Sequence, residues 1–319
     1  MTAMSYQSAA ALNAERIAGT ASSARAWLAS LLERIPTRGD VAVRALSHVL
    51  IAYWIADTMA GKDRPKTADF TEVAHHVARS LNASENCIQV DGVKPTLKLL
   101  VEILLSSEGL RVEPFRQFLT QSASLLRRAD PVLEADPSLM DKRILLYCAG
   151  ILPRPPAASA DGVRVLLDKF RLSAPVEVID ALTLQLECLT GWGTRPVNSE
   201  LLEPSLGEIL AGLAVYRLRN YDLIAAARLL RLRLYLESGC ITAGRDDLYN
   251  VLCMHHRTEG PFGWFGPEAA MLRELSPVLV EDTEFCLPTT LECLWTLAER
   301  SMDGWRLFDK VPQYLLLDN

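Results

Sequence analysis

The chain has 319 residues, 50% hydrophobic and 23% charged, with a formal net charge of -6. That length and apolar content suffice for one large core, and the absence of a basic stripe with interleaved aromatics excludes a typical nucleic-acid-binding surface. Seven cysteines, an odd number without a CxxC spacing, favour free thiols in a reducing cytoplasm over a disulfide framework.

In chain order, the hydrophobic periodicity predicts six helical pairs, each a more polar helix followed by an apolar one. The apolar helices each run towards a glycine, and these glycines recur at intervals of 41 to 65 residues: Gly61, Gly109, Gly150, Gly191, Gly239 and Gly304. The predicted pairs are 20–35 with 40–60, 67–81 with 95–105, 114–129 with 138–149, 161–172 with 175–190, 199–218 with 221–238, and 245–256 plus 267–275 with 288–301.

This repetition predicts an all-α fold in which six helical hairpins close into an (α/α)6 toroid or barrel. The polar helices have one apolar face and suit an outer layer, whereas the apolar helices suit an inner layer packed on both sides. We expect one domain over residues 1–319, with residues 302–319 as a C-terminal tail. The alternative is an irregular all-helical domain.

The most hydrophobic segment, residues 41–60, carries Arg44, His48 and Asp57. Charged and titratable groups at this density favour a buried core helix over a membrane span. Charged residues also interrupt the first thirty positions, so we expect no secretory leader. The sequence therefore predicts a soluble cytoplasmic protein without a membrane partner.

The most unusual stretch is residues 255–267, which combines two imidazoles, a guanidinium, a carboxylate and three aromatic rings around three glycines. In a closed ring of hairpins it lies on the face where the N-termini of the inner helices favour an anion. We predict His255, His256 and Glu259 as catalytic residues, and Arg257, Phe262, Trp264 and Phe265 as substrate-binding residues. The alternative is an aromatic plug, with both histidines ending a helix.

Acidic side chains form two further candidate groups. Asp282 and Glu284 precede the last inner helix and are predicted to bind substrate, with helix capping as the alternative. Five acids lie within apolar helices, where burial raises a carboxyl pKa towards values suited to proton transfer: Asp57, Glu102, Glu187, Glu237 and Glu292. Asp57, Glu237 and Glu292 are expected near the C-terminal portions of their helices, where pairing with arginine or lysine is the alternative.

Several motifs of known chemistry are missing. The sequence has no HExxH, no Cys/His ligand set, no P-loop, no GxGxxG after a strand and no GxSxG elbow. We therefore expect neither a tightly bound metal nor a cofactor.

The six-hairpin layout, together with the turn 259–266 (EGPFGWFG), resembles the helical toroids of terpenoid cyclases, protein prenyltransferases and six-hairpin glycosidases. The DxDD box and the zinc ligands of the first two are absent, so no catalytic residue is carried over. The chain is also similar to helical proteins of actinomycete natural-product pathways, including aziridine-forming cyclases. That similarity implies intramolecular displacement, with cationic groups stabilising a departing sulfate.

The leading hypothesis is therefore a specialised-metabolite biosynthetic enzyme that catalyses cofactor-independent ring closure or elimination on a small polar or anionic substrate. The first alternative is a non-catalytic helical partner subunit or scaffold, in a heteromer or homo-oligomer, which contacts its partner through Trp305, Leu307, Phe308 and residues 311–317. The second is a glycosidase-like hydrolase, which needs two opposed carboxyl groups.

Overall fold

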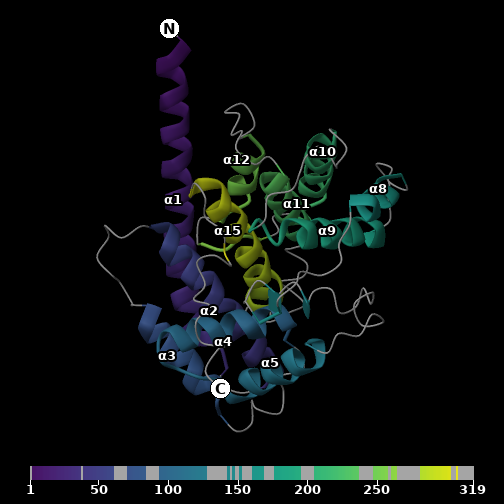
Figure 1. Cartoon of the computed structure of the whole chain (residues 1–319). Helices are drawn as coiled ribbons and strands as arrows, with labels where there is room; N and C mark the ends of the chain where they lie inside the picture. Colours follow the sequence, from purple (N-terminus) through teal and green to yellow (C-terminus); the bar gives the residue numbers. More distant parts are fainter. Residues whose placement is uncertain are drawn as a thin grey trace.

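The computed structural model describes residues 2–36, 39–60, 70–83, 93–127, 142–143, 146–147, 151–152, 160–168, 176–194, 205–236, 247–257, 260–263, 281–302 and 307. For residues 2–14 only the helical backbone is considered. Every regular element in these ranges is helical, comprising eleven α-helices and one π-helical segment (Figure 1). The predicted all-α class is confirmed.

The first half of the described chain follows the predicted helices closely. Its elements are α1 (Thr2–Arg34), α2 (Asp40–Ala60), α3 (Phe70–Leu81), α4 (Pro95–Ser107) and α5 (Glu113–Leu126). The main difference is α1, which begins at Thr2 instead of residue 20. Its added turns are rich in alanine and serine, so helix propensity continues where no apolar periodicity marks a helix.

The second half agrees with the prediction in the same way. Its elements are α8 (Ala160–Asp168), α9 (Val176–Thr190), α10 (Leu206–Arg219), α11 (Leu223–Leu236), α12 (Asp247–Met254), the π-helical segment η5 (Glu281–Cys286) and α15 (Leu287–Ser301). Residues 142–143 and 146–147, inside the predicted helix 138–149, are helical. The predicted helix 267–275 and Glu237 lie outside the described residues.

The end of α4 shows how a glycine stops a helix. Gly109 has a φ of +72°, a left-handed conformation that favours glycine. The N–H of Leu110 donates to the carbonyl of Leu105 at 2.9 Å, and the N–H of Gly109 donates to that of Ser106 at 3.0 Å. These two bonds form a Schellman motif, which satisfies the last carbonyls of α4 and turns the chain towards α5.

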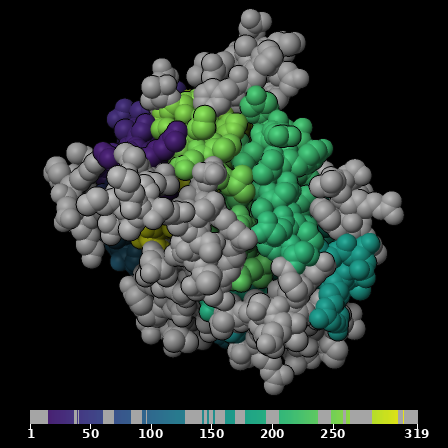
Figure 2. Space-filling view, turned by 90° about the horizontal axis from the view of Figure 1, so that it is seen from above, coloured from purple at the N-terminus to yellow at the C-terminus, as the bar shows by residue number. Residues whose placement is uncertain are grey.

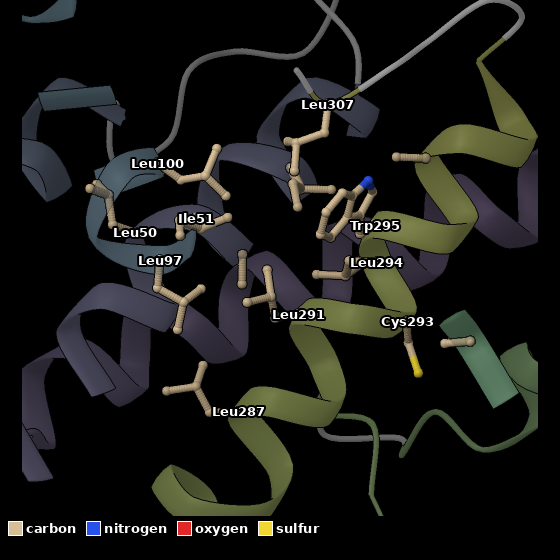
Figure 3. Close-up of a cluster of buried hydrophobic side chains, with 14 of the residues drawn as sticks. Leu50, Ile51, Leu97, Leu100, Leu287, Leu291, Cys293, Leu294, Trp295 and Leu307 are labelled. Atoms are coloured by element: carbon tan, nitrogen blue, oxygen red, sulfur yellow. The ribbon is translucent and has the colours of Figure 1, made fainter. Parts of the chain in front are cut away.

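The predicted inner helices pack against one another. α2 contacts α4, α9 contacts α11, and α15 contacts both α11 and α2. Between α2, α4 and α15, apolar side chains that include Leu50, Leu97 and Leu291 interleave to form a buried core (Figure 3). The last helix described, α15, therefore packs both on α2 near the start of the chain and on α11 in its second half.

Figure 1 shows α2 to α5 gathered at one end of the molecule and α8 to α12 at the other, with α15 passing between them. The N-terminal part of α1 extends beyond both groups as a rod. Seen from above, α10 and α11 lie beside α12, and α12 lies beside α1 (Figure 2). Of the helices described, none is both long enough and apolar enough to cross a bilayer.

Candidate functional site

The turn predicted to carry catalytic residues is packed into the core at Phe262. His256 and Phe262 form an isolated antiparallel bridge, and their rings meet edge to face with centroids 5.2 Å apart. The side chain of Phe262 is fully buried, and its N–H donates to Oγ1 of Thr290 at 2.9 Å. Phe262 thus plugs the space against the start of α15.

The two histidines of this turn have different surroundings. Nε2 of His256 lies 3.0 Å from the carbonyl oxygen of Gly260, and a carbonyl only accepts, so Nε2 carries the proton. His255 instead packs edge to face on Tyr221, with ring centroids 5.8 Å apart. Burial lowers the pKa of both imidazoles, with a smaller opposing contribution from the Gly260 hydrogen bond at His256.

The other predicted residues of the turn are described in part. The N–H of Arg257 donates to the carbonyl of Pro261 at 2.9 Å, and its guanidinium lies against Gly263. Glu259, Trp264 and Phe265 lie outside the described residues. The roles predicted for the residues of this turn stay predictions.

Asp282 and Glu284 form ion pairs that tie η5 to the first hairpin. An oxygen of Asp282 lies 3.0 Å from Nη2 of Arg34 at the end of α1, and one of Glu284 lies 2.9 Å from Nη2 of Arg44 on α2. Both carboxylates therefore have a structural partner, and their predicted part in substrate binding remains untested.

The acids of the apolar helices are also paired. Asp57 bonds to Arg25 at 2.7 Å, and Glu102 accepts the backbone N–H of Val112 at 3.1 Å. Burial raises the pKa of Glu102 despite that hydrogen bond. Glu292 lies in the N-terminal half of α15, not near its C-terminal end as expected. The expectation was wrong because α15 begins at Leu287, only five residues before Glu292.

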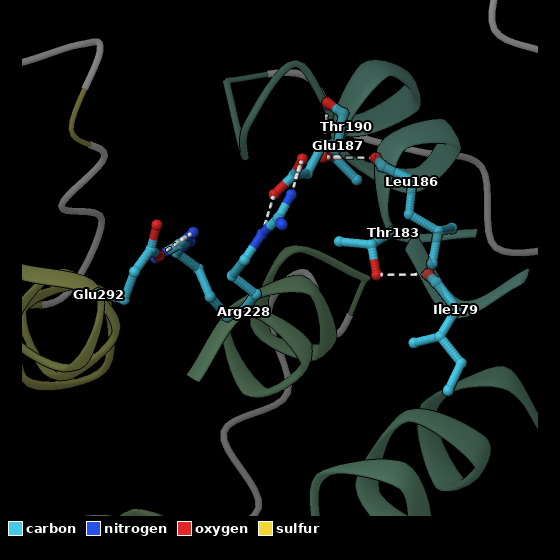
Figure 4. Close-up of polar contacts among 8 residues, drawn as sticks. Ile179, Thr183, Leu186, Glu187, Thr190, Arg228 and Glu292 are labelled. Carbon is cyan, nitrogen blue, oxygen red and sulfur yellow. Dashed lines mark hydrogen bonds and ion pairs between the residues drawn. The ribbon is translucent and has the colours of Figure 1, made fainter. Parts of the chain in front are cut away.

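We give the name inner-helix cluster to titratable groups of several inner helices that form two ion pairs, together with His48 and Lys94, whose electrostatic interactions reach Glu292. Its members are His48 on α2, Lys94 just before α4, Glu187 on α9, Arg228 and Arg231 on α11, and Glu292 on α15. Figure 4 shows its two ion pairs side by side. Three cations therefore accompany two carboxylates, which leaves one surplus positive charge.

The two arginines occupy one face of α11 because they are three residues apart. Arg228 binds Glu187 through two bonds, Nε to Oε1 at 3.3 Å and Nη2 to Oε2 at 2.9 Å. Nη2 of Arg231 lies 2.9 Å from Oε2 of Glu292. The side chain of Arg231 is 3% exposed, whereas those of Arg228 and Glu292 are 31% and 23% exposed. The side chains of Arg228 and Glu292 therefore keep partial contact with solvent, whereas that of Arg231 does not.

The positive charges around Glu292 keep its carboxylate ionised. Burial by itself raises a carboxyl pKa, but the charges of Arg231 and Arg228, the hydrogen bond from Arg231 and the charge of Lys94 outweigh it and lower the pKa of Glu292. Burial likewise opposes the charge on Arg231, yet the nearby Glu292 raises its pKa. The pair is thus charged over the whole physiological range.

His48 supplies a neutral ring beside these charges. Its Nδ1 lies 2.8 Å from the carbonyl oxygen of Arg44, so Nδ1 carries the proton and Nε2 is left as an acceptor. Burial lowers the pKa of His48 to about 4, and the charge of Lys94 adds to the effect. The hydrogen bond to the Arg44 carbonyl and, to a smaller extent, the charge of Glu292 oppose this shift without reversing it.

Replacing His48 with glutamine is expected to reduce the fall in the free energy of unfolding that occurs as the pH is lowered. The pKa of His48 falls from 6.5 to about 4 on folding, so the unfolded chain binds a proton that the folded chain excludes. Stability therefore falls as pH drops from about 6.5 to about 4, and we expect His48 to account for about 2–3 kcal/mol of that loss, since the ring keeps some solvent contact.

Urea unfolding of both proteins between pH 7 and pH 4 measures this contribution. The wild type should lose more stability than the His48→Gln variant across that interval. Parallel curves would show that His48 titrates in the folded protein as it does in the unfolded chain.

Sequence reasoning identified Glu187 and Glu292 but not their partners. The available signal was three arginines inside the leucine-rich segment 223–236, where charged side chains require a partner. In the described part of the chain, no group of three or more His, Cys, Asp or Glu side chains is placed to hold a metal ion.

Comparisons with models of protein families, with curated proteins and with solved structures find no match to this chain. The resemblances to helical toroids and to aziridine-forming cyclases thus gain no support from them and remain expectations.

Proposed function

We propose that the chain is a cofactor-independent enzyme that binds a small anionic substrate at the inner-helix cluster and promotes ring closure or elimination. The observation that carries this proposal is that two ion pairs join α11 to α9 and to α15, while the charges of Lys94 and Glu292 act on His48 of α2 and the side chains of Arg228 and Glu292 keep contact with solvent. Buried charges lower stability unless they are paired, so apolar helices that keep Glu187 and Arg231 in their interior favour a functional site.

The finer architecture belongs to the same proposal. A toroid of six hairpins requires each inner helix to pack on the next and the last on the first. The packing of α2 on α4, of α9 on α11, of α11 on α15 and of α15 on α2 supports such a ring. In that arrangement the cluster lies where inner helices face one another.

The proposed chemistry is stabilisation of a departing anion. Lys94 and Arg228 balance the negative charge that develops as the bond from carbon to the leaving oxygen breaks, and the anion departs with the electron pair. In ring closure, the lone pair of a substrate amine forms the new C–N bond. Nε2 of His48 accepts a hydrogen bond from that amine, and because the pKa of His48 is about 4, the released proton passes on to solvent.

Sulfate is the probe that tests this anion site. In the wild type, potassium sulfate should shift the side-chain nitrogen signals of His48 in a histidine-detected NMR titration, whereas potassium chloride at equal ionic strength should not. Lys94→Met removes the surplus charge, and we expect it to weaken sulfate binding about tenfold. Lys94 is exposed, and in the described structure its side chain makes no hydrogen bond or ion pair, so this variant should fold.

Arg164→Gln is the matched control, because it removes an exposed cation that pairs with Asp161 on α8. It should leave sulfate binding unchanged. Equal losses of sulfate affinity in both variants would show that sulfate binding depends on overall charge only. The absence of any shift of the His48 signals in the wild type would contradict the proposed site.

A second candidate function is that of a partner subunit or scaffold. Large apolar side chains are exposed on α10 to α12 and on the turn between α10 and α11: Tyr216, Tyr221, Ile224, Val251 and Met254. Met254 is 66% exposed. Leu307, predicted as a partner contact, is fully buried and offers no such surface, and the other predicted tail contacts lie outside the described residues. Light scattering on the NMR samples distinguishes the two functions, since an oligomer without sulfate binding favours the second.

A further inference from the structure

One buried carboxylate oxygen connects three parts of the chain. Oε1 of Glu299 accepts hydrogen bonds from the hydroxyl of Tyr235 at 3.0 Å, from Nε1 of Trp295 at 3.2 Å and from the backbone N–H of Leu307 at 3.2 Å. These donors belong to α11, α15 and the C-terminal segment. Glu299 is therefore the point where Leu307 meets α11 and α15, two of the helices of the inner-helix cluster.

Trp295 links this oxygen to the cluster. Its indole edge donates to Glu299, and the guanidinium carbon of Arg231 lies 3.7 Å from the centroid of its ring. Arg231 in turn binds Glu292 at 2.9 Å. Because the indole is rigid, a change at its edge also tilts the face on which Arg231 rests.

Leu307 is held by more than its hydrogen bond. Its side chain is fully buried and lies with Leu291, Leu294 and Trp295 in the core cluster of Figure 3. Releasing Leu307 therefore exposes an apolar side chain and removes one of the three donors to Glu299.

We infer that Glu299 is a positioning residue for the inner-helix cluster, and that docking of Leu307 couples the C-terminal segment to anion binding there. This inference rests on the proposed function. Glu299 sets the indole of Trp295, Trp295 sets Arg231, and Arg231 holds Glu292 beside His48. By linkage, a C-terminal segment that strengthens anion binding when docked is itself docked more firmly when the anion is bound.

The test compares Leu307→Ala and Glu299→Ala with Thr296→Val. Thr296 lies on the same face of α15 as Glu299, and its hydroxyl donates to the carbonyl of Ala227 on α11 at 2.8 Å. It therefore joins the same two helices, but that bond does not involve Trp295. The readouts are the indole N–H signal of Trp295 and the dissociation constant of sulfate, both by NMR of the full-length protein.

We expect Leu307→Ala and Glu299→Ala to shift the Trp295 indole signal and to weaken sulfate binding about fivefold. Thr296→Val should change neither, and Glu299→Gln, which keeps an acceptor oxygen, should retain most of the wild-type affinity. If Glu299→Ala does not fold, Leu307→Ala and Glu299→Gln still provide the comparison.

Two results would overturn the inference. One is an unchanged Trp295 signal in Leu307→Ala, and the other is a loss of sulfate affinity in Thr296→Val as large as in Leu307→Ala, which would indicate a merely structural role. If the wild type binds no sulfate, the proposed anion site fails, while the response of Trp295 to Leu307→Ala still reports whether Leu307 positions the indole.

Discussion

Arg231→Gln should lower the free energy of unfolding by about 3–5 kcal/mol, because it leaves the carboxylate of Glu292 partly buried without its main partner. The substitution also removes the contact between the guanidinium and the ring of Trp295. Urea unfolding at pH 7, followed by circular dichroism, measures the loss.

The double variant Arg231→Met with Glu292→Leu separates the two sources of that loss. Removing both charges together removes the unpaired carboxylate, so we expect most of the lost stability to return. A single variant that loses less than about 1 kcal/mol would contradict the pairing of Arg231 with Glu292.

Gly260→Ala is expected to destabilise the protein by about 3–4 kcal/mol. A Cβ at this position would lie 2.5 Å from Cβ of Trp27 and 2.7 Å from the carbonyl oxygen of Ser23, both on α1. The φ of Gly260 is +109°, which an alanine rarely adopts. The turn therefore has to move away from α1, and Phe262 has to move with it. Thermal and urea unfolding both report this change.

Gly109→Ala is the control for that experiment. Gly109 also has a positive φ, +72°, but no atom lies within 4 Å of a Cβ built there. This variant carries the backbone strain alone, so we expect a loss of about 1 kcal/mol. Equal losses at the two glycines would show that contact with α1 contributes nothing to the cost at Gly260.

Helix positions were largely predictable from the sequence. The apolar periodicity of residues 40–60 and the polar residues that bound it predict α2 with its observed limits. Pro288 marks the first turn of α15. The N-terminal extension of α1 was left out of the first predicted pair because its alanines favour a helix without leaving an apolar face for periodicity to detect. The π-helical turn of η5 was missed as well, since its sequence differs little from that of an α-helical turn.

The candidate site was predictable only in part. Apolar surroundings identified Glu187 and Glu292 as buried acids, but Glu187 bonds to an arginine 41 positions away, and that pairing follows from how α9 packs on α11. His48 entered the sequence argument only as evidence against a membrane span. Its neutral state depends on burial between packed helices, and the carbonyl of Arg44 fixes the ring proton on Nδ1.

The turn at residues 255–267 likewise shows that residue types alone do not predict the surroundings of a side chain. Residue types around His255 and His256 suit proton transfer, but the described backbone gives the two imidazoles different partners and buries Phe262 against Thr290. The aromatic plug, which the sequence left as an alternative, describes the position of Phe262. Hydrophobic composition alone does not separate a plug from a pocket wall.

A crystal structure of the full chain grown in ammonium sulfate tests the central claim most directly. We predict density for a sulfate ion within hydrogen-bonding distance of Lys94 or Arg228, with the pair of Arg231 and Glu292 intact and Nε2 of His48 facing the ion. Side chains of Lys94 and Glu292 that lie apart, on opposite sides of an apolar wall that sulfate does not enter, would contradict it.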